Sequence, residues 1–100
     1  EARFRWLHAR AGSAGDLLEA AHEAFDAVGW VRSVDEVVTA GWLGPEVTAV
    51  ARARLGDVAV LARDPVAFVD PAEAMSFHLI GRHDSMTVDE MLVPALAVVT

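Results

Sequence analysis

The fold is decided by residues 3–32, RFRWLHARAGSAGDLLEAAHEAFDAVGWVR, in which the spacing of the apolar residues changes twice. Residues 3–10 alternate in period two, with Phe4, Trp6 and His8 on one face, which predicts a strand. From Leu17 the apolar residues recur near a period of 3.6, which predicts an amphipathic helix. A short strand over 30–32 follows, so residues 3–32 are expected to form a β-α-β unit.

Helix boundaries are indicated by capping residues. A Ser or Thr followed three residues later by an acidic residue has capping-box spacing and predicts helix starts at Ser13, Ser33 and Thr87. Gly29 and Gly41 are expected to end the first two helices, because glycine is favoured just beyond a helix end. Another helix is expected to begin at Pro45 and to stop at Gly56, with these residues turned inward: Val47, Val50, Ala51 and Leu55.

The rest of the chain favours extended structure. Residues 58–63 and 66–69 flank Asp64-Pro65 and predict a β-hairpin, and 77–80 is a candidate short strand. After one helical turn from Thr87, Leu92 to Val99 is expected to be a buried strand, with a helix kinked at Pro94 as the alternative. These elements predict an α/β fold, α+β for the excised chain: a β-α-β unit, two short helices, a β-hairpin and a C-terminal strand.

Composition narrows the classes of partner. The net charge is −7, which argues against nucleic-acid binding through a basic face, and the absence of Cys excludes disulfides and thiolate metal sites. The apolar run 91–99 is too short to span a bilayer as a helix. Since 54% of the residues are hydrophobic, we expect an apolar surface that contacts another part of the protein or self-associates.

The organisation predicted is one domain, residues 1–100, cut from a longer protein. The chain starts directly on a strand pattern, with neither an initiator Met nor a targeting segment before it, so we expect an excised piece. We also expect a cytoplasmic location.

Of the four His residues, only one has a setting that favours chemistry. His8, His22 and His78 lie in predicted strands or on a helix face and are interpreted as packed or solvated residues. His83 lies in the polar loop 81–87, where an imidazole held by flanking elements can bind a metal. Most lone loop histidines are nevertheless surface residues, so the residues alone leave both interpretations open.

Several other patterns are set aside. His83-Asp84-Ser85 cannot form a catalytic triad, because three consecutive residues cannot place the Asp side chain behind the His and the Ser side chain in front of it. The spacing of five between His78 and His83 does not match a helical zinc motif. Three aspartates fall at predicted turns and are interpreted as turn formers: Asp57, Asp64 and Asp70.

The stretch 81–94, GRHDSMTVDEMLVP, resembles the closing motif of the type I phosphodiesterase/nucleotide pyrophosphatase family of the alkaline phosphatase superfamily. In bacterial members this motif typically reads Gly-x-His-Gly-Ser-Leu-Thr, then a short helix with Glu-Met, then Val-Pro. The stretches 3–8, 41–45 and 55–58 also resemble the actinobacterial branch. The one departure is Asp84, which stands where the family usually has Gly.

The resemblance implies an alkaline phosphatase-like core and a site with two divalent metal ions, commonly zinc. His83 occupies the position of the last metal ligand, while the nucleophile and the remaining ligands would lie upstream, in a part that this chain lacks. The implied partners are that amino-terminal part and a phosphate-ester or nucleotide substrate. Asp84 would be a partner of the ligand, a ligand itself or the mark of a degenerate site, and a non-Gly residue there is expected to keep ordinary φ.

Two functional hypotheses follow. In the first, the chain is the carboxy-terminal segment of a metal-dependent phosphodiesterase, supplies the metal ligand His83, and has no catalytic residue of its own and no activity alone. In the second, it is a non-enzymatic α+β domain that binds a small ligand or a protein. The parent reading frame would distinguish them, because the first requires an upstream nucleophile and further Asp and His ligands.

Overall fold

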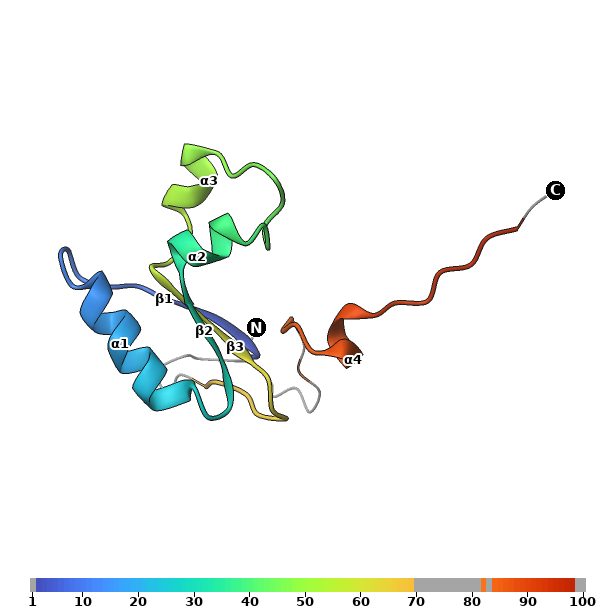
Figure 1. The fold of residues 1–100 in the computed structure, drawn as a ribbon, viewed down its shortest axis with the longest axis horizontal. Coiled ribbons are helices and arrows are strands. Elements are labelled where there is room, and N and C mark those ends of the chain that lie inside the picture. The colour runs from blue at the N-terminus through green and yellow to red at the C-terminus, as the bar shows by residue number, and fades with distance from the viewer. Residues whose placement is uncertain (1, 70–81, 83, 99–100) are drawn as a thin grey trace, which may run out of the picture.

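The computed structural model describes residues 2–69, 82 and 84–98 and has an α+β fold (Figure 1). The α+β class expected for this chain by itself is confirmed, and an alkaline phosphatase-like core stays a prediction. The described elements are, in chain order, β1 (Phe4–Leu7), α1 (Ala14–Phe25), β2 (Gly29–Ser33), α2 (Val34–Thr39), α3 (Ala49–Ala53), β3 (Val58–Ala62) and α4 (Val88–Met91).

The three strands form an antiparallel sheet in the order β1-β3-β2. Leu61 of β3 is opposite Phe4 of β1 on one side and Trp30 of β2 on the other. Because β3 is antiparallel to both neighbours, β1 and β2 run in the same direction with β3 inserted between them. The predicted β-α-β elements are therefore confirmed over residues 3–32, as a split unit whose two parallel strands are separated by a third.

The core lies on both faces of β3, and all five of its residues are buried. On the α1 face the buried residues are Ala21, Val31, Val58 and Val60, with Leu7 and Phe25 packed against them. On the α2 face they are Val37, Ala59 and Leu61, with Phe4, Trp6, Trp30, Trp42 and Met86 packed against them. The alternation read from β1 is thus confirmed, since Phe4 and Trp6 face one core and Leu7 faces the other.

The start of α1 after Ser13 was predicted correctly, whereas its capping box and its predicted end at Gly29 were wrong. Ser13 has φ −113° and ψ 11°, which is not the extended conformation of an N-cap, and its side chain makes no capping hydrogen bond. The acidic residue at the third position is Asp16, which is shorter than the Glu or Gln of a capping box. At the other end α1 stops at Phe25, and the buried Gly29 is the first residue of β2 rather than a helix terminator.

The helix predicted from Ser33 is confirmed. For the helix predicted from Pro45 to Gly56, a shorter helix is present, but its predicted bounds and inward face are wrong. At α2 the Ser33 side chain accepts from the Glu36 N–H at 3.1 Å and the Glu36 carboxylate accepts from the Ser33 N–H at 3.0 Å. Gly41, with φ +77°, follows this helix as expected. In contrast, α3 begins after Thr48, whose hydroxyl accepts from Ala51 N–H, and no residue of it is buried.

The predicted hairpin is absent from the described residues. β3 was expected to pair with 66–69 across Asp64-Pro65, but both of its edges pair with β1 and β2 instead. Residues 66–69 run as irregular chain, in which the Phe68 N–H donates to the Ala2 carbonyl. The strand predicted at 77–80 lies outside the described residues.

The tail also differs from its prediction. The helical turn α4 is confirmed, but residues 92–98 are exposed irregular chain, neither the predicted strand nor the kinked helix. Figure 1 shows them running away from the body, and the radius of gyration is 15.8 Å against about 13 Å for a compact chain of this length. Within the described chain, no helix combines the length and apolarity required to cross a membrane.

Candidate functional site

The family-like motif is anchored at the end of the sheet where β3 finishes and β1 begins. Ser85 is 4% exposed, and its hydroxyl donates to the carbonyl of Ala62, the last residue of β3. Met86 packs against the core on the α2 face. One polar and one apolar side chain therefore hold the described residues on the carboxyl side of position 83 against the sheet.

Glu90 joins this loop to the start of β1. Its Oε2 accepts from Arg3 Nε at 2.8 Å and from the Ser85 N–H at 2.9 Å, and its Oε1 accepts from Arg3 Nη2 at 2.7 Å and from the Thr87 hydroxyl at 2.6 Å. The Arg3 and Glu90 side chains are only 11% and 13% exposed. This two-pronged geometry is the strong form of an arginine–carboxylate pair.

The charge state of the pair follows from these contacts. Hydrogen bonds from Arg3, with smaller contributions from Thr87 and Ser85, lower the pKa of Glu90 from 4.5 to about 2 although partial burial opposes them. The same pair raises the pKa of Arg3. Both groups are therefore charged throughout the physiological range.

Arg3 also reaches the chain that leaves β3. Its Nη1 donates to the carbonyls of Asp64 at 3.0 Å and Val66 at 2.7 Å. One guanidinium thus ties together the start of β1, the segment after β3 and the motif loop. Figure 1 shows α4 beside the N-terminus, as this connection requires.

The helix start at Thr87 was predicted correctly, although its capping box was not. Thr87 has an extended conformation, yet its side chain accepts no hydrogen bond from the helix backbone. It donates to Glu90 instead, whose carboxylate is directed to Arg3 and Ser85 rather than to the Thr87 N–H. The role of Arg3 and Glu90 was missed because local spacing carries no signal of a pair 87 positions apart.

Asp84 corrects another expectation. Its φ is +82°, in the left-handed region that glycine adopts readily and most other residues avoid. Asp is one of the residues that tolerates this region best. Asp84 therefore does not keep the ordinary φ that was expected of a non-glycine residue.

A hollow of about 500 Å³ lies beside the loop and has charged walls of both signs. Its charged lining residues are Arg3, Arg63, Arg82, Asp89 and Glu90. Within this set the three guanidinium groups outnumber the two carboxylates. The hollow is thus locally more positive than a chain of net charge −7 would suggest.

The other residues considered from the sequence have structural roles or lie outside the described chain. His22 pairs with Asp26 on the surface of α1 at 2.8 Å, and His8 is exposed after the end of β1. Asp57 accepts from the Ala9 N–H at 2.7 Å and so fixes the chain leaving β1. Three residues lie outside the described residues: Asp70, His78 and His83.

His83 therefore stays a prediction as a metal ligand. Among residues 2–69, 82 and 84–98, no three His, Asp or Glu side chains converge as a metal-binding group. Searches of protein-family models, curated proteins and solved structures found no match to this chain.

Proposed function

We propose that this chain is the carboxy-terminal segment of a metal-dependent phosphodiesterase or nucleotide pyrophosphatase. In this proposal the alkaline phosphatase-like core is completed by an amino-terminal part of the same protein. His83 binds one of two divalent ions, commonly zinc, and the substrate is a phosphate ester or a nucleotide. The segment alone is inactive, because the nucleophile and the other ligands belong to the amino-terminal part.

The observation that carries the proposal is the backbone of Asp84. A φ of +82° at a non-glycine residue costs conformational energy, and it occurs at the position where the family motif has glycine. Similarity of letters between two loops can arise by chance. A glycine, which the family motif has at this position, would adopt the same φ without strain, and this compatibility supports the carry-over.

The anchoring of the loop supports the same role. A metal ligand is effective when its position is fixed by surrounding hydrogen bonds. Ser85, Thr87 and Glu90 of the motif are connected to one another and to Arg3, and Ser85 also bonds to β3. These hydrogen bonds fix the described residues on the carboxyl side of position 83 to the end of the sheet.

Zinc takes three or four protein ligands, and residues 2–69, 82 and 84–98 contain no group of three or more His, Asp or Glu side chains that could hold one. We therefore derive no catalytic step for this chain. Its part in the proposal is to position His83 and to close the hollow whose arginines would face an anionic ester.

The test uses the intact reading frame and the isolated chain in parallel. In the intact protein, His83→Ala is expected to lower bound metal and hydrolysis of a nitrophenyl phosphodiester together, because one change removes both affinity and geometry. The matched control is His22→Ala, which removes an exposed imidazole and should leave both unchanged. Metal content is measured by mass spectrometry of the purified proteins.

Two results would overturn the proposal. The first is wild-type activity and metal content in His83→Ala, which would make His83 a surface residue. The second is phosphodiesterase turnover by the isolated 100-residue chain, with or without added zinc, that survives repurification.

The second candidate function is a non-enzymatic ligand-binding domain. It is favoured by one specific observation, an apolar pocket of about 550 Å³ on the α1 face. The described residues that line this pocket all lie outside the loop 81–87.

A further inference from the structure

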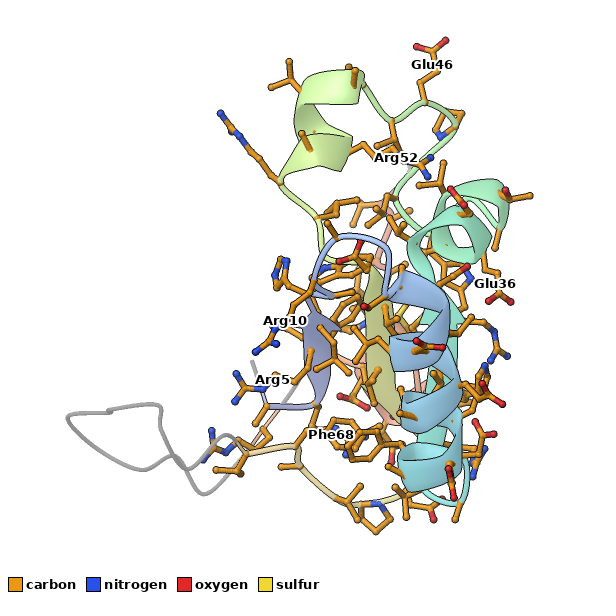
Figure 2. All side chains as sticks on the ribbon, turned by 90° about the vertical axis from the view of Figure 1, so that its left-hand side faces the viewer. Arg5, Arg10, Glu36, Glu46, Arg52 and Phe68 are labelled. Atoms are coloured by element: carbon orange, nitrogen blue, oxygen red, sulfur yellow. The ribbon has the colours of Figure 1, made fainter. Side chains whose placement is uncertain are left out.

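In the described sheet, β1 and β2 are both edge strands, because β3 lies between them. Figure 2 shows β1, in blue, at one margin of the sheet. An edge strand presents N–H and C=O groups on its outer side, and these can pair with another extended segment. The register of each strand with β3 shows which of its backbone groups face outward.

Side chains already occupy outward backbone groups of β2. The Arg63 N–H donates to the Val28 carbonyl, so the even-numbered positions of β2 pair with β3 and the odd-numbered positions face outward. On the outer side, Arg32 Nη1 donates to the Val31 carbonyl at 2.7 Å. The outward N–H of Ser33 donates to the capping carboxylate of α2 at 3.0 Å. Charged side chains at an edge oppose pairing with a further strand.

The outward groups of β1 have a different setting. The Ala62 N–H donates to the Arg3 carbonyl, so the odd-numbered positions of β1 pair with β3. The backbone N–H and C=O groups of Phe4 and Trp6 therefore face outward. Among residues 2–69, 82 and 84–98, no strand or side chain bonds to them there. Of the two edges, β1 is thus the one that offers backbone partners.

The surroundings of this edge are apolar. The Phe4 and Trp6 rings lie on the α2 face with centroids 5.6 Å apart, and Leu7 lies on the α1 face. One end of the edge is occupied, where the Phe68 N–H donates to the Ala2 carbonyl. A short strand placed beyond that end would have apolar neighbours on both faces of the sheet.

The tail, residues 92–98, has the properties of such a strand. It contains no charged side chain, and its Val and Leu side chains are between 73% and 97% exposed. Figure 1 shows it running away from its own sheet. An apolar extended segment in this position is available to a second copy of the chain.

Pro94 determines which side of the tail can pair. Proline has no N–H, so within a sheet its nitrogen has to face away from the neighbouring strand. Because backbone groups alternate along a strand, Val93, Ala95 and Ala97 would then face the partner strand. Val93 also precedes the proline, and this position favours extended backbone.

We infer that two copies of this chain exchange tails, each placing residues 93–97 beside Phe4 and Trp6 of the other copy. Burying one Val or Leu side chain removes about 60–120 Å² of apolar surface from water. One tail and its receiving edge would therefore bury at most about 1,000 Å², less than the roughly 1,200 Å² at which specific interfaces begin. Two reciprocal contacts pass that limit, so exchange in both directions is the stable form.

The first experiment locates the receiving strand. The chain has no Cys, so Ala97→Cys carries a single nitroxide label. A labelled copy without ¹⁵N is mixed with an unlabelled ¹⁵N copy at about 1 mM, and amide signals are compared before and after reduction of the nitroxide. We expect broadening of the Phe4 and Trp6 amides, and much less at Val31 on the other edge. Signals broadened in this mixture report only on contacts between different copies.

The second experiment tests the side that pairs. Ala95→Pro adds apolar surface but removes an N–H that faces the partner strand, so it should weaken dimerisation by about tenfold. Val98→Pro is the matched control, because its N–H faces away and the two side chains are similar in size. It should weaken dimerisation by less than about threefold. Sedimentation gives the dissociation constants, and the amide spectrum of residues 2–69 shows that the sheet is intact in both variants.

Three results would overturn the inference. One is the absence of broadening between copies at about 1 mM, and another is broadening at Val31 equal to that at Phe4 and Trp6. The third is a larger effect of Val98→Pro than of Ala95→Pro. None of them bears on the metal-ligand role of His83, so the two proposals succeed or fail separately.

Discussion

Gly29 and Leu61 approach each other so closely across the β2–β3 pair that no larger residue fits at position 29. A Cβ added to Gly29 would overlap the Leu61 carbonyl oxygen and lie 3.3 Å from the Phe68 ring. Leu61 is fully buried at the centre of the sheet and cannot move aside. The glycine is therefore required by packing, not by backbone conformation.

Gly29→Ala is accordingly expected to destabilise the chain by about 1–3 kcal/mol, the usual range for overpacking a core. The matched control is Gly15→Ala, because a Cβ at this position in α1 meets nothing within 4 Å. That change should be neutral or stabilise by up to about 1 kcal/mol, since alanine favours helix. Urea unfolding followed by circular dichroism measures both, and equal midpoints for the two variants would contradict the packing argument.

The Arg3–Glu90 pair makes a pH-dependent contribution to stability. Its sign follows from the pKa of Glu90, which is lowered from 4.5 to about 2 on folding. The stabilisation is complete above the unfolded value and is lost as the pH falls from about 5 to about 2. Glu90→Gln should therefore cost about 2–3 kcal/mol at pH 7 and flatten the stability profile over that acidic range.

The control for this prediction is Asp89→Asn, one position away on α4 and exposed. It should change stability by less than about 0.5 kcal/mol, as surface substitutions usually do. If Glu90→Gln has an equally small effect, the ion pair does not hold the loop in solution.

The left-handed backbone at position 84 can be measured with two substitutions that both remove the carboxylate. Asp84→Gly and Asp84→Ala lose the same polar contacts and differ in tolerance of a φ of +82°. The glycine variant should be the more stable of the two by about 1 kcal/mol. Chemical denaturation of the pair provides the difference, and an advantage for alanine would mean that the loop does not have this conformation in solution.

The tail is expected to mediate self-association. Leu92, Val93, Leu96 and Val98 are between 73% and 97% exposed, an apolar extended segment that can pair with another chain. Light scattering over a concentration series should show a rising mean mass that Val98→Lys reduces. Val50→Lys is the control, because Val50 is equally apolar and 68% exposed on α3. A monomer at all concentrations would contradict the prediction.

Patterns in the sequence correctly predicted the elements that depend only on neighbouring residues, such as β1 and α2. The alternation of Phe4, Trp6 and Leu7 and the reciprocal bonds of Ser33 and Glu36 are properties of adjacent residues. The hairpin after β3 was wrong because strand pairing is decided by competition. A strand with residues apolar on both faces is best buried at the centre of a sheet, as the register of β3 with β1 and β2 shows.

For the candidate site, the helix start at Thr87 was predicted correctly from its capping residue. The metal-ligand role of His83 stays a prediction, because that residue lies outside the described residues. The partner of Glu90 was not found, because Arg3 lies at the other end of the chain and long-range ion pairs leave no periodic trace. The backbone of Asp84 was predicted wrongly because the residue type was given more weight than the turn that the loop has to make.

The central place of β3 has a consequence for the order in which the chain folds. β1 and β2 are synthesised before β3, yet in the described sheet each of them pairs with β3. Phe4 therefore cannot pair with Leu61 until β3 has been synthesised. On a ribosome, residues 1–57 would therefore leave the exit tunnel with α1 and α2 able to form but before β1 and β2 can make the pairs that the described sheet shows. Formation of this sheet has to follow synthesis of β3. Nascent chains that end before β3 should therefore remain accessible to proteases and chaperones.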